Sequence, residues 1–144
     1  MAELPTPSQT VGPFFNIGMP GEPAGDGPLR ISGTVYDGEG QIVADALIES
    51  WQADSGTFHR AETDADGRYQ LATVESADEF ILVAVFARGL LKHVVTRIYF
   101  SGDGIPPEVP PERRDTLIAK DSGEGGWNFD IRLQGEGETV FFDV

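Results

Sequence analysis

The chain has 144 residues, which is enough for one domain with a substantial core and too few for two. Its 18 glycines, 10 prolines and 40% hydrophobic residues favour a globule of short strands joined by many turns. The formal net charge of −14 argues against nucleic acid or an anionic membrane as a partner, and the absence of cysteine excludes disulfides and thiolate metal sites.

The N-terminal region is expected to lack regular secondary structure. Residues 6–15 hold two prolines and a glycine among small polar residues, which favours an extended arm, and residues 16–28 are a loop rich in glycine and proline. The first residues show neither a basic nor an apolar signal region, and no apolar run is long enough to span a bilayer. We therefore expect an arm and loop over residues 1–28, a folded domain over 29–144, and a soluble cytoplasmic protein.

The first predicted strands carry the clearest patterns. Leu29–Tyr36 is followed by the turn Asp37–Gly40, and Ala46–Gln52 is a second strand in which the large aromatic Trp51 is expected to anchor the core. The run Phe80–Phe86 consists of seven consecutive apolar residues and is predicted to be a strand buried on both faces. The remaining predicted strands are Arg68–Val74, His93–Phe100, Asn128–Leu133 and Thr139–Phe142.

Two stretches between the strands are expected to be irregular. Asp64–Gly67 is typical of a tight turn, and Ile105–Thr116, with four prolines, is typical of a loop with at most a short helix. Seven or eight short strands without helical periodicity predict an all-β fold, a two-sheet β-sandwich with short loops and little helix.

The residue inventory offers few chemical groups for catalysis. The histidines His59 and His93 and the tyrosines lack paired ligand spacing, so each is more typical of a structural residue than of a metal ligand. Asp64–Gly67 resembles the start of a calcium loop but lacks the downstream glutamate, and there is no serine nucleophile elbow or phosphate-binding loop. For Arg88, which follows Phe80–Phe86, the pattern alone favours an ordinary exposed residue at the end of a strand over a functional arginine at the rim of the sheet.

Seven motifs nevertheless identify a family. They are Thr6–Phe14 (TPSQTVGPF), Val35–Gly38 (VYDG), Trp51–Asp54 (WQAD), Phe86–Gly89 (FARG), Thr96–Phe100 (TRIYF), Arg113–Ala119 (RRDTLIA) and Phe129–Phe142 (FDIRLQGEGETVFF). In this order, from end to end, they resemble the α subunits of protocatechuate 3,4-dioxygenases, within the intradiol ring-cleaving dioxygenases. The resemblance implies the β-sandwich of that family.

The resemblance also implies that the family's ferric iron belongs to a partner. Intradiol dioxygenases bind iron through two tyrosines and two histidines, which in this subgroup belong to the β subunit. Here Phe58 stands where the first ligand tyrosine is expected, Phe80-Ile81-Leu82 replaces the paired histidines, and the loop of the second tyrosine is reduced to Glu75–Glu79. The loss of these donors predicts no metal site on this chain and Fe(III) in the β subunit.

By the same resemblance, Thr10, Gly12, Pro13 and Arg88 contact the substrate in an active site shared with the β subunit, and Arg88 is also the candidate catalytic residue of this chain. A glycine followed by a proline lets the backbone approach a small ligand closely, and a guanidinium offsets carboxylate or catecholate charge. The alternative for the arm residues is that they only shape an arm that packs on the partner. For Arg88 the family context favours the functional role over the structural one.

Three hypotheses follow. The leading one is a non-metallated α subunit in a hetero-oligomer, inactive alone, that helps an iron-bearing β subunit cleave protocatechuate with O2 to 3-carboxy-cis,cis-muconate. The alternative is a non-catalytic binding or scaffolding module of the same fold. An autonomous enzyme with a metal at His59, His93 or Tyr69 is disfavoured because these residues lack ligand spacing.

Overall fold

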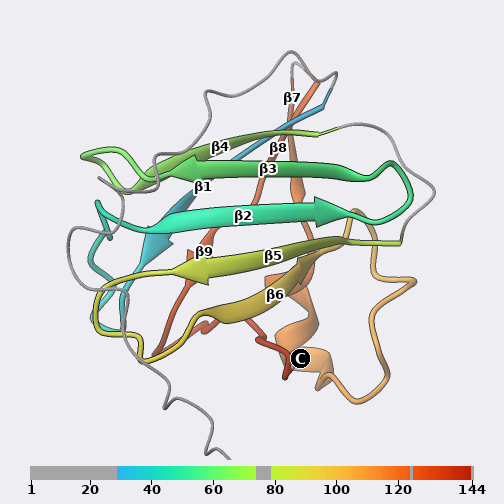
Figure 1. The fold of residues 1–144 in the computed structure, drawn as a ribbon. Helices are drawn as coiled ribbons and strands as arrows, with labels where there is room; N and C mark the ends of the chain where they lie inside the picture. Colours follow the sequence, from blue (N-terminus) through green and yellow to red (C-terminus); the bar gives the residue numbers. More distant parts are fainter. Residues whose placement is uncertain (1–28, 74–78, 124, 144) are drawn as a thin grey trace, which may run out of the picture.

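The computed structural model describes residues 29–73, 79–123 and 125–143, which form two sheets packed face to face (Figure 1). Predictions for residues 1–28, including those for Thr10, Gly12 and Pro13, lie outside the described residues. The described elements are β1 Leu29–Tyr36, β2 Leu47–Gln52, β3 Thr57–Glu62, β4 Arg68–Thr73, β5 Ile81–Phe86, β6 Val94–Ile98, the 3-10 helix η1 Pro111–Leu117, β7 Lys120–Gly123, β8 Gly126–Asn128 and β9 Ile131–Arg132.

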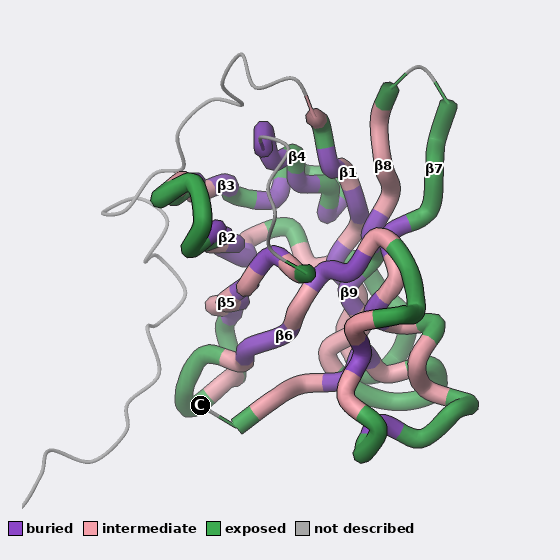
Figure 2. The backbone as a smooth tube through the Cα atoms, turned by 90° about the vertical axis from the view of Figure 1, so that its right-hand side faces the viewer, coloured by how far each residue is buried: buried purple, intermediate pink, exposed green. Residues whose placement is uncertain are grey.

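The first sheet is built around β1. Strand β4 pairs with β1 antiparallel from Leu29↔Thr73 to Thr34↔Arg68, and β8 pairs with the other edge of β1 in parallel. Strand β9 continues along β1 after β8, and β7 closes the sheet beside β8, giving the order β4-β1-β8-β7. The C-terminal segment thus returns to the first strand, as the side view in Figure 2 also shows.

The second sheet is antiparallel throughout, in the order β3-β2-β5-β6. Residues 48, 50 and 52 of β2 turn to the core, as do residues 81, 83 and 85 of β5, because side chains alternate between the faces of a strand. The opposite face, called the outer face below, carries residues 47, 49 and 51 of β2 and 82, 84 and 86 of β5. Figure 1 shows this sheet in front of the first one.

The core lies between the two sheets and is made by alternate residues of their strands. Figure 2 shows buried residues alternating with partly buried ones along strands such as β5. Its members include Ile31, Val35, Ile48, Tyr69, Leu71, Ile81, Val83, Val85, Ile98, Phe129 and Ile131, each at most 3% exposed. Burial of these side chains is the main stabilising contribution to the sandwich, and the prediction of an all-β, two-sheet fold is confirmed.

Two predictions about individual strands were wrong. Strand β5 is not buried on both faces: Ile81, Val83 and Val85 are buried, whereas the alternate residues on the outer face are only partly buried. Trp51 does not anchor the core, since its side chain lies on the outer face and is 43% exposed. In both cases, side chains alternate between the two faces of the strand, so the apolar residue lies on the outer face whatever its size.

Most predicted strands are confirmed within one or two residues, but the C-terminal region differs. Asn128–Leu133 contains the end of β8 and the short β9, and Thr139–Phe142 forms no strand although Phe142 N donates to the Val95 carbonyl at 2.7 Å. Strands β3 and β7 were not predicted. The short helix expected in the proline-rich region is η1, and no helix among the described residues is long and apolar enough to cross a bilayer.

Candidate functional site

Arg88 lies in a tight turn at the end of β5. Leu90 N donates to the Ala87 carbonyl at 3.3 Å, which closes the turn around Arg88 and Gly89. Gly89 has φ +84°, a left-handed conformation that glycine adopts without the strain of a side chain. Ala87 is buried in the core, so alternation turns the Arg88 side chain to the outer face, where it is 63% exposed.

Asp45 forms an ion pair with Arg88. Leu47 of β2 pairs with Phe86 of β5, and two residues beyond that pair Asp45 comes opposite Arg88. Arg88 Nε and Nη2 both contact Asp45 Oδ2. The Asp45 side chain is only 18% exposed, so the carboxylate lies against the sheet while the guanidinium faces solvent.

The positions at which the resemblance expected iron ligands carry hydrocarbon side chains. Trp51 pairs with Phe58 on one side and with Leu82 on the other, and Leu82 pairs with Arg97, so one row crosses all four strands on the outer face. We call these four residues the cross-strand row. Phe58 is 50% exposed and offers no ligand atom, and neither does Leu82.

Arg97, at the end of the cross-strand row, is held by aromatic rings. Its guanidinium carbon lies 4.4 Å from the ring centroid of Phe80 and 4.3 Å from that of Phe142, and Nη1 donates to Tyr99 Oη at 3.3 Å. Stacking of this kind stabilises a planar cation without a carboxylate. Phe80 therefore contributes to a cation–π contact at the position where the resemblance expected a histidine.

The other candidate ligands do not converge. Tyr69 is a strand residue, as predicted: it lies in β4 in the core, where its hydroxyl donates to the Phe129 carbonyl. Burial, and to a smaller extent the charge of Asp130, raises the pKa of Tyr69 above its usual value, so the phenol stays protonated. His59 lies on the inward face of β3, and His93 precedes β6, with its ring centroid 5.0 Å from that of Phe86. Over residues 29–73, 79–123 and 125–143, no group of three or more His, Asp or Glu residues could hold a metal ion.

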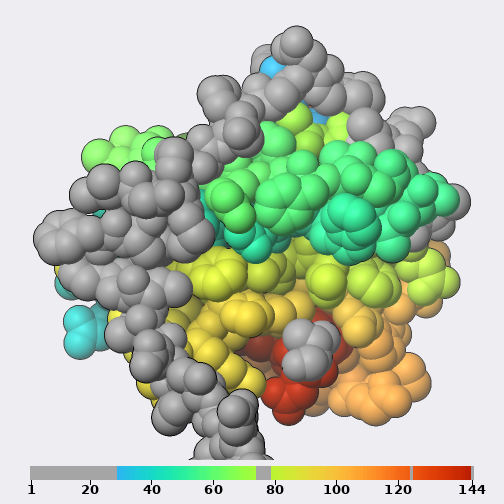
Figure 3. Space-filling view, in the orientation of Figure 1, coloured from blue at the N-terminus to red at the C-terminus, as the bar shows by residue number. Residues whose placement is uncertain are grey.

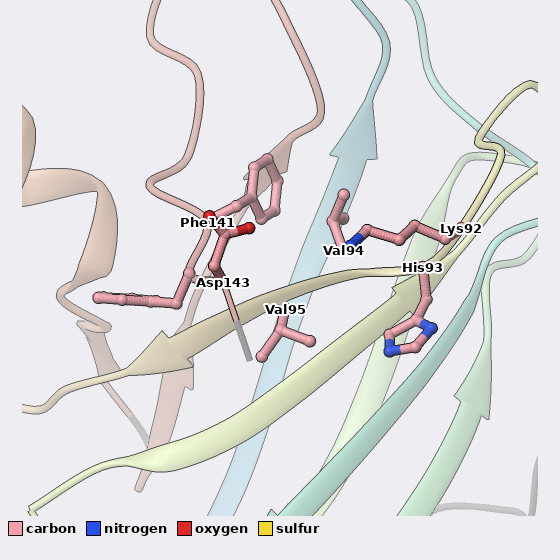
Figure 4. Close-up of a pocket in the computed structure, with 7 residues that line it drawn as sticks. Lys92, His93, Val94, Val95, Phe141 and Asp143 are labelled. Carbon is pink, nitrogen blue, oxygen red and sulfur yellow. The ribbon is translucent and has the colours of Figure 1, made fainter. Parts of the chain in front are cut away.

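A surface pocket of about 180 Å³ lies between the start of β6 and the C-terminal segment (Figure 4). Its lining includes Lys92, Val95, Phe141 and Asp143, and in Figure 4 the Lys92 side chain extends toward the C-terminal segment. His93 also lines the pocket, and its ring packs against that of Phe86. The pocket marks where the C-terminal segment lies along β6.

Of the four predicted site residues, Arg88 is the one that lies among the described residues. The structure shows Arg88 exposed at the rim of the sheet, as the strand pattern predicts, while Thr10, Gly12 and Pro13 lie outside the described residues. Sequence analysis missed Asp45, whose contact depends on the pairing of β2 with β5, and the stacking of Arg97, which depends on rings from two separate segments of the chain. The only sequence signal for Arg97 was its place in the motif Thr96–Phe100.

Comparison with known proteins places the chain in a family. It is 36% identical to the protocatechuate 3,4-dioxygenase alpha chains of Pseudomonas putida and Burkholderia cepacia, over 96% of this chain and 96% and 97% of theirs. It is 28% identical to the protocatechuate 3,4-dioxygenase beta chain of Burkholderia cepacia, over 83% of this chain and 69% of that one. No protein-family model matches the chain.

Solved structures support the fold. The dioxygenase domain of a dioxygenase carbohydrate-binding protein fusion from Streptomyces sp. SirexAA-E superposes with a TM-score of 0.56 at 23% identity, over 91% of this chain and 99% of that one. The 3-chlorocatechol 1,2-dioxygenase of Rhodococcus opacus gives a TM-score of 0.56 at 18% identity, over 76% of this chain and 62% of that one. With the sequence identity over nearly its whole length, the chain belongs to the protocatechuate 3,4-dioxygenase α-chain family of the intradiol dioxygenases.

Proposed function

We propose that this chain is the non-metallated α subunit of a hetero-oligomeric protocatechuate 3,4-dioxygenase. Its partner is a β-type chain that holds the ferric iron, and the two together cleave protocatechuate with O2 to 3-carboxy-cis,cis-muconate. The identity to two α chains over 96% of this chain supports the assignment. The hydrocarbon side chains of Phe58 and Leu82 support the placement of the iron on the partner, since they provide no ligand atoms.

The observation that carries the proposal is the composition of the outer face. An exposed guanidinium, Arg88, lies at one end of this sheet, and the exposed aromatic pair Trp51 and Phe58 lies at the other. Figure 3 looks onto this side, where β2, β3, β5 and β6 form the surface. Large exposed aromatic residues are typical of protein contacts, and a guanidinium binds an anionic substrate.

In the proposed complex, this chain binds and orients the substrate. The guanidinium of Arg88 offsets the negative charge of the substrate's carboxylate or catecholate oxygens at the shared site, which lowers the cost of bringing the anion out of water. Thr10, Gly12 and Pro13 belong to the predicted arm of residues 1–28, whose backbone contacts the substrate. The oxidation chemistry is the partner's, and the described residues of this chain supply no ligand set for it.

Arg88→Ala tests this role. In a complex co-purified with a β-type chain, the substitution is expected to lower kcat/KM for protocatechuate by tenfold or more, roughly the effect of losing a charged hydrogen bond. Arg68, an exposed arginine at the start of β4, provides the control, because Arg68→Ala removes a cation from the other sheet. Equal turnover of the Arg88→Ala and Arg68→Ala complexes would show that Arg88 has no functional role.

The second candidate is a binding or scaffolding module of the same fold. The exposed Trp51–Phe58 pair suits a protein contact whether or not a reaction follows. This candidate becomes the better account if the chain binds a protein partner but the complex neither holds iron nor consumes oxygen with protocatechuate.

A further inference from the structure

We propose that Asp45 is a positioning residue for Arg88. This inference rests on the proposed function of Arg88 and adds a second residue of this chain to the shared site. The carboxylate of Asp45 holds one edge of the guanidinium and thereby directs the remaining N–H donors outward, toward the substrate.

The geometry of the pair carries the inference. Nε and Nη2 of Arg88 are both engaged by Asp45 Oδ2, which leaves the Nη1 group and the second hydrogen of Nη2 available as far as the described residues are concerned. An arginine side chain has four flexible torsions, and an exposed one loses much conformational entropy when it is fixed in a site. An ion pair formed before the substrate arrives reduces that cost.

The backbone beneath both residues is also fixed. Ala46, next to Asp45, donates its N–H to Thr63 Oγ1 at 2.9 Å and accepts from Thr63 N at 3.0 Å. Arg88 is fixed by the turn of Ala87 and Leu90, and the antiparallel pairing of β2 and β5 brings the two segments opposite each other. Asp45 and Arg88 themselves lie in turns just beyond the paired ends of β2 and β5, and these hydrogen bonds together with the strand pairing fix the backbone on which their contact is built.

A positioning role and a purely electrostatic role predict opposite results. If Asp45 only reduced the positive charge of Arg88, its removal would strengthen the binding of an anionic substrate and lower KM. If Asp45 orients Arg88, its removal leaves the guanidinium free to adopt many rotamers and kcat/KM falls. The sign of the change in kcat/KM distinguishes these roles.

The test is a double-substitution cycle in the complex with the β-type chain. We measure kcat and KM for protocatechuate in complexes that contain Asp45→Ala, Arg88→Ala, or both. Asp45→Ala is expected to lower kcat/KM about tenfold, a typical effect of a mispositioned group. In the Arg88→Ala background it is expected to have no further effect, because its target is already absent.

Matched variants control for folding and for loss of an ion pair in general. Asp45→Asn keeps the size of the side chain and one acceptor oxygen, so its kcat/KM should lie between those of the native protein and Asp45→Ala. Asp115→Asn breaks the exposed ion pair with Lys120 and should leave kcat/KM unchanged.

The outcomes separate this inference from the proposed function. If Arg88→Ala lowers kcat/KM but Asp45→Ala and Asp45→Asn do not, or if Asp45→Ala lowers it equally in the Arg88→Ala background, the positioning role is wrong and the function of Arg88 stands. If Arg88→Ala itself has no effect, the proposed function of Arg88 is wrong, and with it this inference.

Discussion

Tyr69 shows how a single buried polar atom contributes to the sandwich. The residue is 3% exposed, and its hydroxyl donates to the Phe129 carbonyl across the first sheet. Tyr69→Phe removes the hydroxyl and leaves the buried Phe129 carbonyl without this hydrogen-bond donor. We therefore expect a loss of about 1–3 kcal/mol in the free energy of unfolding. Urea unfolding measures it, with Tyr36→Phe as the control, since the Tyr36 ring is partly buried and stacks on Arg132.

The raised pKa of Tyr69 adds a dependence on pH. The pKa of a tyrosine in an unfolded chain is about 10, whereas burial keeps Tyr69 protonated above that pH in the folded state. Below a pH of about 10, Tyr69 is protonated in both the folded and the unfolded state, and its contribution to the free energy of unfolding is fully present. Above that pH, only the unfolded state loses the tyrosine proton. The free energy of unfolding should therefore fall as pH rises above about 10, and Tyr69→Phe should show a smaller fall. Parallel pH profiles of the two proteins would contradict this assignment.

Residue-level predictions from the sequence succeeded where the signal was local. Arg88 is a charged residue directly after an apolar run, and this pattern correctly predicted an exposed residue at the end of a strand. Trp51 was misplaced because a large aromatic suggests the core, while the side of the strand it occupies depends on alternation with Ile48 and Ser50. Asp45 gave no local signal, since its partner lies 43 residues away in the chain.

At the scale of elements, the join between β8 and β9 depends on a close approach to β1. Phe129 N donates to the Ser32 carbonyl at 2.8 Å, and a Cβ at Gly33 would lie 1.8 Å from the Phe129 carbonyl oxygen. Asp130 also accepts from Thr34 N at 2.9 Å. Only a glycine at position 33 lets the C-terminal segment pass from β8 to β9 beside the first strand.

Gly33→Ala should therefore be strongly destabilising. The obstructing atom is backbone, so a strand must move, and we expect a loss of at least about 2–3 kcal/mol. Gly102→Ala is the control, because its nearest neighbour would be a flexible side chain at 3.9 Å. Thermal unfolding of both variants is the measurement; similar melting temperatures for the two would contradict the close-approach argument.

The element boundaries were predictable where hydrophobic patterns were long. Strands β1, β4, β5 and β6 follow from runs of apolar or alternating residues, and their ends lie close to the predicted ones. The region after η1 was less predictable, because β7 consists of exposed polar residues and β9 of two residues. Such strands depend on their partners more than on their own composition.

At the scale of the whole molecule, the outer face of the second sheet carries more exposed aromatic surface than is usual for a free domain. A free domain tends to cover its aromatic side chains, yet Trp51 and Phe58 are about half exposed side by side on adjacent strands. With a net charge of −14, the rest of the chain favours a less acidic partner. The cross-strand row and Arg88 therefore define the face that we expect the β-type chain to cover.

Replacement of this aromatic pair should weaken assembly more than folding. For Trp51→Ala combined with Phe58→Ala we expect a dissociation constant for the β-type chain at least tenfold higher, since exposed aromatic residues commonly dominate interfaces. Ile42→Ala, at another exposed apolar residue that bridges to Tyr36 of the first sheet, should leave the affinity unchanged. Isothermal titration of each variant with the partner measures the effect, and an unchanged affinity of the double variant would place the interface elsewhere.

The whole-chain predictions had a different basis from the local ones. Composition and strand count predicted the sandwich, but the family followed from motifs spread over the chain, and the chemistry followed from the family. The order β4-β1-β8-β7 with β9 on β1 could not be predicted from the sequence, because it depends on long-range pairing of the C-terminal segment.

The most direct test of the central claim is the iron content and oxygen uptake of this chain, alone and co-purified with a β-type chain, with protocatechuate as substrate. We predict no bound iron and no uptake for the chain alone, and stoichiometric iron with protocatechuate-dependent uptake for the complex. Iron and activity in the isolated chain would contradict the account, as would a co-purified complex that lacks both.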